Sequence, residues 1–320
     1  MKISIRYLIA LLLVTVTFAC SNGTRSANND GGDIEKTKTI AKNRKFVLPT
    51  IPAMLTDSVS RTNYLVAHYW DNFDFNDTTL IHEPDITEQG IVDFLDAFRF
   101  VNKENAVASV IAVLKKAEVE TTGRMYSYFL ETIGEFLYEP NSVVRNEEIY
   151  IPVTEYIINN GKSNLAERER AKYLLALMMK NRIGEVASDF EYTQASGKVG
   201  TLHEFKAPYT LLFFYSPDCS GCANSIDFVN SSGTAINSAI EGKKLKVLAF
   251  YPDNDRQLWI DHIGKIPSGW ITGYDRERVV RVRNMYDLKG TPAIYLLDEN
   301  KRIILKGITI PAVEEYFKRM

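Results

Sequence analysis

The feature that most constrains the fold is a run of large apolar residues that leads directly into a pair of cysteines. Residues 211–215 are Leu-Leu-Phe-Phe-Tyr, and the pair, Cys219 and Cys222, lies within the next seven residues. Such a run predicts a buried strand, and the spacing of Cys222, Ile226 and Val229 predicts a helix after it. We therefore expect the two cysteines to lie where a strand ends and a helix begins.

The position of the pair predicts its chemistry. At the start of a helix, unpaired backbone N–H groups and the helix dipole stabilise negative charge, so we expect a lowered pKa for the Cys219 thiol. Cys222 lies one turn later on the same side of the helix, where it can displace whatever Cys219 has bound. Cys219 is the predicted nucleophile and Cys222 the predicted resolving cysteine, with Pro217 and Asp218 as candidates for substrate contact.

A metal site is the main alternative for two cysteines at this spacing. A tetrahedral zinc site would normally need two further ligands, but the sequence has only one other cysteine, Cys20, and no histidine close to the pair. The four histidines are His68, His82, His203 and His262. We therefore expect redox chemistry at the pair, without a metal or an organic cofactor.

The first 20 residues are typical of an export signal. Lys2 and Arg6 form a short positive start, and residues 7–19 are mostly apolar. This stretch is shorter than the roughly 20 residues that a membrane-spanning helix needs. Residues 17–20, Thr-Phe-Ala-Cys, resemble the cleavage box of bacterial lipoproteins, which implies that Cys20 becomes the acylated first residue of the mature protein.

Thr17 and Phe18 depart from the usual residues of that box, so ordinary secretory cleavage, with Cys20 left as a free thiol, is the alternative. Residues 21–45 are polar and rich in Asn, Gly, Ser and Lys, which predicts a flexible tether. We expect a protein of the cell envelope that faces the periplasm and is held to the membrane by its lipid anchor only.

Composition is that of a globular protein rather than a disordered or membrane-embedded one. The 320 residues are enough for two domains, and 45% of them are hydrophobic against 24% charged. With 38 basic and 40 acidic residues, the net charge of −2 favours neither a nucleic-acid backbone nor an anionic membrane surface. We therefore expect no nucleic-acid partner.

Residues 46–180 have apolar positions at helical spacing and predict an all-helical domain of five or six helices. Asp57 and Thr87 are the expected N-caps, and Pro140 marks a break. Five ring-bearing residues near its start either pack in the core, the usual fate of large aromatic side chains, or line a groove for a partner. They are His68, Tyr69, Trp70, Phe73 and Phe75.

Residues 181–320 alternate short apolar runs with helical stretches, which predicts an α/β domain. The expected strands are residues 210–215, 245–251, 293–297 and 302–305. The expected helices follow Cys222, extend from Val279 to Tyr286, and begin near Pro311. Trp259, His262 and Trp270 are expected to pack inside this domain.

Pro292 directly precedes one of these strands, where a proline is costly unless it serves a turn. From the sequence alone an ordinary trans bond is expected, because only about 5–6% of X-Pro bonds are cis.

Residues 184–320 resemble the thioredoxin-like domain of the TlpA/ResA class of envelope thiol–disulfide oxidoreductases. The resemblance is in the order and spacing of residues 184–190 (GEVASDF), the cysteine motif, residues 286–292 (YDLKGTP) and residues 297–300 (LDEN). It implies a thioredoxin-like fold and disulfide reduction, with disulfide-containing envelope proteins as substrates and an upstream thiol as electron donor. It also implies that Pro292 is cis and lies against the cysteine pair, and that Thr291 offers its backbone to the cysteine segment of the substrate.

Two departures from that class concern the buried carboxylate that manages the proton of the resolving cysteine. The positions where relatives carry it are Phe213 and Ser225 in this chain. Asp218 and Asp227 are near the pair, but solvated roles are expected for both. The proton relay is therefore left unassigned.

The helical part resembles a domain of unknown activity, DUF5106, that precedes such domains in lipoproteins of Gram-negative bacteria. The resemblance lies in residues 48–52 (LPTIP), 68–74 (HYWDNFD) and 87–89 (TEQ).

Two other functions stay open. A thiol peroxidase shares the fold, and Ser216 suits the hydroxyl position of its motif, but Leu212 stands where that motif needs proline. A binding or assembly protein could use the thioredoxin-like part as a scaffold only.

Overall fold

The structure is a computed structural model that describes residues 45–140 and 142–320, all of which belong to one compact unit. The predicted export signal, Cys20 and all but the last residue of the predicted tether lie outside the described residues. Among the described residues, none of the helices has the length and apolar character needed to cross a membrane.

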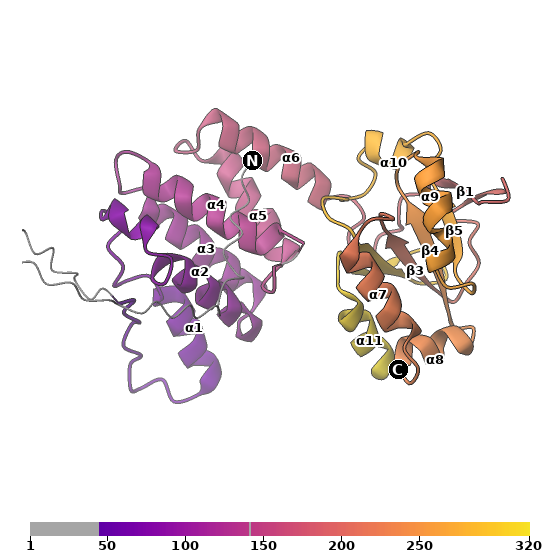
Figure 1. Cartoon of the computed structure of the whole chain (residues 1–320). Coiled ribbons are helices and arrows are strands. Elements are labelled where there is room, and N and C mark those ends of the chain that lie inside the picture. Colours follow the sequence, from indigo (N-terminus) through magenta and orange to yellow (C-terminus); the bar gives the residue numbers. More distant parts are fainter. Residues whose placement is uncertain (1–44, 141) are drawn as a thin grey trace, which may run out of the picture. The chain divides into compact units, whose positions relative to one another are not determined.

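The first part of the described chain is helical, as its periodicity predicts (Figure 1). Its α-helices are α1 (Ser58–His68), α2 (Thr87–Asp96), α3 (Lys103–Ala117), α4 (Arg124–Tyr138), α5 (Glu147–Asn159) and α6 (Leu165–Met178). Two short 3-10 helices, Thr78–His82 and Ala97–Phe100, flank α2. We call residues 45–180 the helical part.

Of the two predicted N-caps in this part, one is confirmed and the other is wrong. The Asp57 carboxylate caps α1 by accepting a hydrogen bond from the Ser60 N–H at 2.7 Å. Thr87 is instead the first residue of α2, with Ile86 in the cap position. The Thr87 hydroxyl donates to the carbonyl oxygen of Leu80 at 2.7 Å, so it bonds to the preceding 3-10 helix rather than to its own helix.

The aromatic group near the start of the helical part is core and not a groove. Tyr69, Trp70 and Phe75 are buried in one cluster with residues from each of the α-helices of this part. The Trp70 ring meets the Phe129 ring edge-on, with centroids 4.9 Å apart, and such contacts add to the stabilisation from burial. His68 lies at the margin, where its Nδ1 is 2.7 Å from a carboxylate oxygen of Asp71.

The second part of the chain, residues 181–320, is built around one mixed sheet. Its strand order is β2-β1-β5-β4-β3-β6-β7, with β3 parallel to β4 and antiparallel to β6. The strands are β1 (Glu191–Thr193), β2 (Val199–Thr201), β3 (Tyr209–Phe214), β4 (Leu245–Tyr251), β5 (Ile271–Tyr274), β6 (Ala293–Leu297) and β7 (Ile303–Lys306). The α-helices are α7 (Ser220–Asn230), α8 (Ala235–Glu241), α9 (Arg256–His262), α10 (Val279–Val282) and α11 (Ile310–Lys318), and Ile263–Lys265 form a 3-10 turn.

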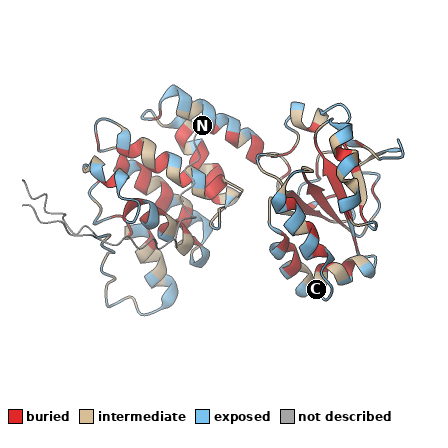
Figure 2. Ribbon diagram, viewed as in Figure 1, coloured by how far each residue is buried: buried red, intermediate tan, exposed pale blue. Residues whose placement is uncertain are grey.

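Both faces of this sheet are covered, so its central strands are mostly apolar and buried (Figure 2). In β3, Leu211 and Phe213 face the core beneath α7, α8 and α11, whereas Leu212 and Phe214 face the opposite core. Helices α7, α8 and α11 pack against one another on the first face (Figure 1). The prediction of a helical domain followed by an α/β domain is confirmed.

Several elements of the second part differ from the prediction, among them the short helix α8, which was not predicted. Strands β1, β2 and β5 were not predicted, because runs of three or four residues carry too little pattern to identify. Helix α10 ends at Val282 instead of continuing to Tyr286, since Asn284 adopts a left-handed conformation with φ of 46°. Tyr286 is still buried, but it reaches the core from a loop.

Candidate active site

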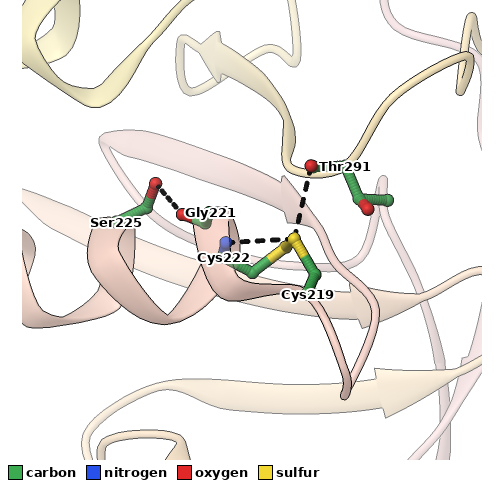
Figure 3. The surroundings of a disulfide bond; sticks show 5 residues. All are labelled: Cys219, Gly221, Cys222, Ser225 and Thr291. Carbon is green, nitrogen blue, oxygen red and sulfur yellow. Dashed lines mark hydrogen bonds between the residues drawn. A yellow bond between two sulfur atoms is a disulfide. The ribbon is translucent and has the colours of Figure 1, made fainter. Parts of the chain in front are cut away.

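The two cysteines lie at the start of α7, directly after β3 (Figure 3). Cys219 is the N-cap residue, and its Sγ accepts a hydrogen bond from the Cys222 backbone N–H at 3.0 Å. The two sulfurs form a disulfide across a Cα–Cα separation of 5.2 Å. One of the donors that every helix start leaves unpaired is therefore aimed at the sulfur of Cys219.

The two sulfurs differ in access to solvent. Cys219 is half-buried, whereas Cys222 is only 2% exposed and belongs to the core beneath α7. A disulfide partner from outside can therefore reach Cys219 but not Cys222. This asymmetry is the arrangement that a nucleophilic cysteine and a resolving cysteine need.

The loop before β6 lies against the pair. The Thr291–Pro292 peptide bond is cis, and the Thr291 carbonyl oxygen is 3.3 Å from Cys219 Sγ. A Cβ added to Gly221 would lie 3.6 Å from Pro292 Cδ, which is ordinary packing contact. When the disulfide is reduced, a thiol at position 219 can donate to this carbonyl oxygen (Figure 3).

Behind the pair there is no carboxylate in either position where related proteins carry one. Phe213 is fully buried, and the Ser225 hydroxyl donates to the carbonyl oxygen of Gly221 at 2.8 Å. The same core holds Tyr215, whose hydroxyl accepts a hydrogen bond from Trp259 Nε1 at 2.9 Å. Burial raises the pKa of Tyr215, so it remains a neutral phenol at ordinary pH.

Asp218 and His262 lie closer together than the sequence suggested. Asp218 is exposed, as expected, but one of its carboxylate oxygens is 3.5 Å from His262 Nε2. His262 Nδ1 is 2.8 Å from the carbonyl oxygen of Leu258, which accepts only, so Nδ1 carries a proton. His262 is thus a polar neighbour of the active-site loop and not only a packing residue, while Trp259 and Trp270 are buried. Pro217 is half-buried on the same loop.

No cluster of three or more His, Cys, Asp or Glu side chains that could hold a metal ion occurs among the described residues.

Comparison with known proteins agrees with this geometry. The model of a domain of unknown function, DUF5106, matches residues 19–181. A crystal structure of a thioredoxin-like protein from Bacteroides caccae is 38% identical, with a TM-score of 0.79, and the match covers 86% of this chain and 99% of that one. The chain belongs to the DUF5106 family.

It is a thioredoxin-like protein with a DUF5106 domain, as the sequence predicted. The C-terminal domain of an uncharacterized protein from Bacteroides fragilis is 44% identical, covering 43% of this chain and 98% of that domain, with a TM-score of 0.42. No curated protein matches the chain.

The DUF5106 part also reaches the loop that carries the cis-proline, which the sequence did not predict. Glu139, at the end of α4, forms an ion pair with Lys289, and the Lys289 ammonium lies 4.6 Å from the centre of the Tyr138 ring. The Tyr138 hydroxyl donates to Asp287 at 2.7 Å. These partners are about 150 residues apart, so no local pattern could have paired them.

Proposed function

We propose that this protein is a thiol–disulfide oxidoreductase in which Cys219 exchanges with substrate disulfides and Cys222 resolves the product. The observation that carries the proposal is the asymmetric pair at the start of α7. A half-exposed sulfur receives a backbone N–H, and a buried sulfur lies one turn behind it.

In the reducing direction the Cys219 thiolate attacks one sulfur of the substrate disulfide. The other substrate sulfur leaves as a thiolate and takes up a proton. Cys222 then loses its proton and attacks Cys219 Sγ, which releases the first substrate sulfur as a second thiol. Two electrons pass to the substrate, the pair becomes the disulfide seen in the structure, and a dithiol donor must reduce it again.

The wider setting follows from the sequence and is part of the same proposal. The predicted export signal, with Cys20 as its lipidated residue, supports a place in the cell envelope, where we propose disulfide-containing proteins as the substrates. That compartment is kept oxidising, so the reducing direction requires a dedicated upstream thiol donor.

Trapping with Cys222→Ser tests the function. The variant keeps the attacking thiol and the backbone N–H that caps it, but it has no sulfur with which to resolve a mixed disulfide. Produced in the envelope of a Gram-negative bacterium, it should accumulate disulfide-linked adducts that appear on non-reducing gels and disappear on reduction. Mass spectrometry of the adducts would name the substrate proteins.

The matched control is the double variant Cys219→Ser with Cys222→Ser, which cannot form adducts through the pair. If the single variant shows no adducts beyond those of the double variant, the exchange function is wrong. The thioredoxin-like part would then act as a scaffold.

A further inference from the structure

A groove beside the cysteine pair has one wall from the helical part. Its cavity is about 340 Å³, at the lower end of the range found for ligand sites. Thr291, whose carbonyl oxygen is 3.3 Å from Cys219 Sγ, lines it, as does Ser225 on the first turns of α7. The groove therefore begins next to the reactive sulfur.

Two connections of the second part and one of the first enclose this groove. The cis-proline loop lies on one side, and the β7–α11 connection, with Ile308 and Thr309, lies on another together with Pro311 in the first turn of α11. Glu139, Pro140 and Arg145 of the helical part complete the lining.

The helical wall is held in place at both of its ends. At one end Gly290 leaves room for Pro140: a Cβ on Gly290 would lie 3.1 Å from Pro140 Cγ. At the other end Arg145 donates to the carbonyl oxygen of Gly307 and pairs with Glu147. The Lys306 ammonium, itself buried, lies 2.9 Å from the same Glu147 carboxylate.

The lining also decides what kind of residue fits. Pro140, Pro292, Ile308 and Pro311 present apolar surface, which makes up nearly half of the lining. The two cations of the lining are paired, Lys289 with Glu139 and Arg145 with Glu147. The Asp287 carboxylate, in contrast, accepts only the neutral Tyr138 hydroxyl among the side chains that the structure describes. An anionic side chain would find both cations already paired, would face the Asp287 carboxylate and would lose hydration, whereas an apolar side chain gains from burial.

We propose that the helical part completes a substrate groove that takes the apolar residue next to the reactive cysteine of an extended protein segment. The inference rests on the proposed exchange function. The occupant is a polypeptide because each residue of an extended chain advances about 3.3 Å, so a cysteine bonded to Cys219 brings its sequence neighbours to the groove. The DUF5106 domain thereby selects substrates for the thioredoxin-like domain.

The test uses three disulfide probes with the reduced full chain. Two are peptides of equal length with one cysteine, blocked as a pyridyl disulfide and flanked by Leu in one peptide and by Asp in the other. The third is dipyridyl disulfide, which is too small to reach from Cys219 into the groove. Release of thiopyridone gives a second-order rate constant for each probe.

We expect the Leu peptide to react at least about tenfold faster than the Asp peptide, the size of effect that one apolar side chain produces in a binding site. In Pro140→Lys this ratio should fall towards one, because an ammonium group in the helical wall disfavours the Leu side chain and attracts the Asp carboxylate. The ratio of the two peptides is the measured quantity, so a change in the reactivity of the sulfurs cancels. The matched control is Val143→Lys, since Val143 is 94% exposed on the same connection and does not line the groove.

Thr309→Arg fills the groove from the opposite wall and tests the proposal independently if Pro140→Lys fails to fold. Thr309 is exposed and makes no capping hydrogen bond at the start of α11, so the change removes no such bond. The ratio should again fall towards one.

An unchanged ratio in a folded variant, or equal rates for the two peptides in the parent chain, would overturn the proposal that this groove selects the substrate residue. If the parent chain reacts with none of the probes, dipyridyl disulfide included, the exchange function itself fails.

Discussion

The starts of α1 and α7 share one capping geometry, but the two capping side chains have different roles. At α1 the Asp57 carboxylate accepts the Ser60 N–H at 2.7 Å, and at α7 the Cys219 sulfur accepts the Cys222 N–H at 3.0 Å. Asp57 has no reactive partner and only caps the start of α1. Cys219 has a sulfur one turn away and the Thr291 carbonyl oxygen facing it. We propose that, once the disulfide is reduced, this backbone donor favours the Cys219 thiolate and the neighbouring groups allow it to react.

The largest effect should come from Cys219→Ser, which separates capping from reactivity. Serine is among the preferred N-cap residues, so the free energy of unfolding under reducing conditions should change by less than about 1 kcal/mol. Disulfide exchange should fall by at least about a thousandfold, since the nucleophile is gone. Urea denaturation and a disulfide-reduction assay measure the two quantities. Appreciable exchange by this variant would mean that Cys219 is not the nucleophile.

Asn164→Ala is the mirror-image control, because it removes a cap that has no chemistry. Asn164 and Glu167 form a capping box at α6, in which each side chain accepts a backbone N–H of the other residue. We expect a loss of about 0.5–2 kcal/mol of stability and no loss of exchange. If Asn164→Ala abolished exchange and Cys219→Ser did not, the start of α7 could not be distinguished from an ordinary helix cap by its chemistry.

This contrast also explains how much could be predicted from the sequence. Features encoded within one turn or one strand were accessible: the Asp57 cap, the central strand that leads to Cys219, and the placement of Cys222 one turn later. Predictions from local sequence were wrong where the side chain bonds to another element instead of to its own helix. Thr87 bonds to the preceding 3-10 helix instead of capping its own.

The walls of the site were beyond sequence reasoning for the same reason. Pro140 and Glu139 meet the cis-proline loop about 150 residues later, and their own surroundings in the sequence indicate only a helix end. His262 looked like a packing residue because its helical neighbours are apolar. Its distance of 3.5 Å from Asp218 depends on where α9 lies on the sheet.

In the reduced pair, two opposing hydrogen bonds determine the acidity of the Cys219 thiol. The Cys222 N–H favours the thiolate of Cys219, whereas the Thr291 carbonyl oxygen, which can only accept, favours the protonated thiol. We expect the N–H and the helix dipole to dominate and the pKa of the Cys219 thiol to lie below the ordinary value of about 8.5. The pH dependence of alkylation of Cys222→Ser, which keeps the backbone donor, measures it. An ordinary or raised pKa would mean that the carbonyl oxygen outweighs the cap.

The smallest effect should appear at Asp57, where the anion of a cap can be titrated without any redox chemistry. The Ser60 N–H lowers the pKa of Asp57 from its ordinary value of 3.8, because only the carboxylate is a full acceptor. The resulting stabilisation is present above pH 3.8 and is lost as the pH falls through the lowered pKa. Asp57→Asn keeps a good cap without this titration, so its urea midpoint should drop less between pH 6 and pH 3 than that of the parent chain. Equal acid sensitivity of the two proteins would show that the cap donor does not favour the anion, and the same donor could then not be credited with activating Cys219.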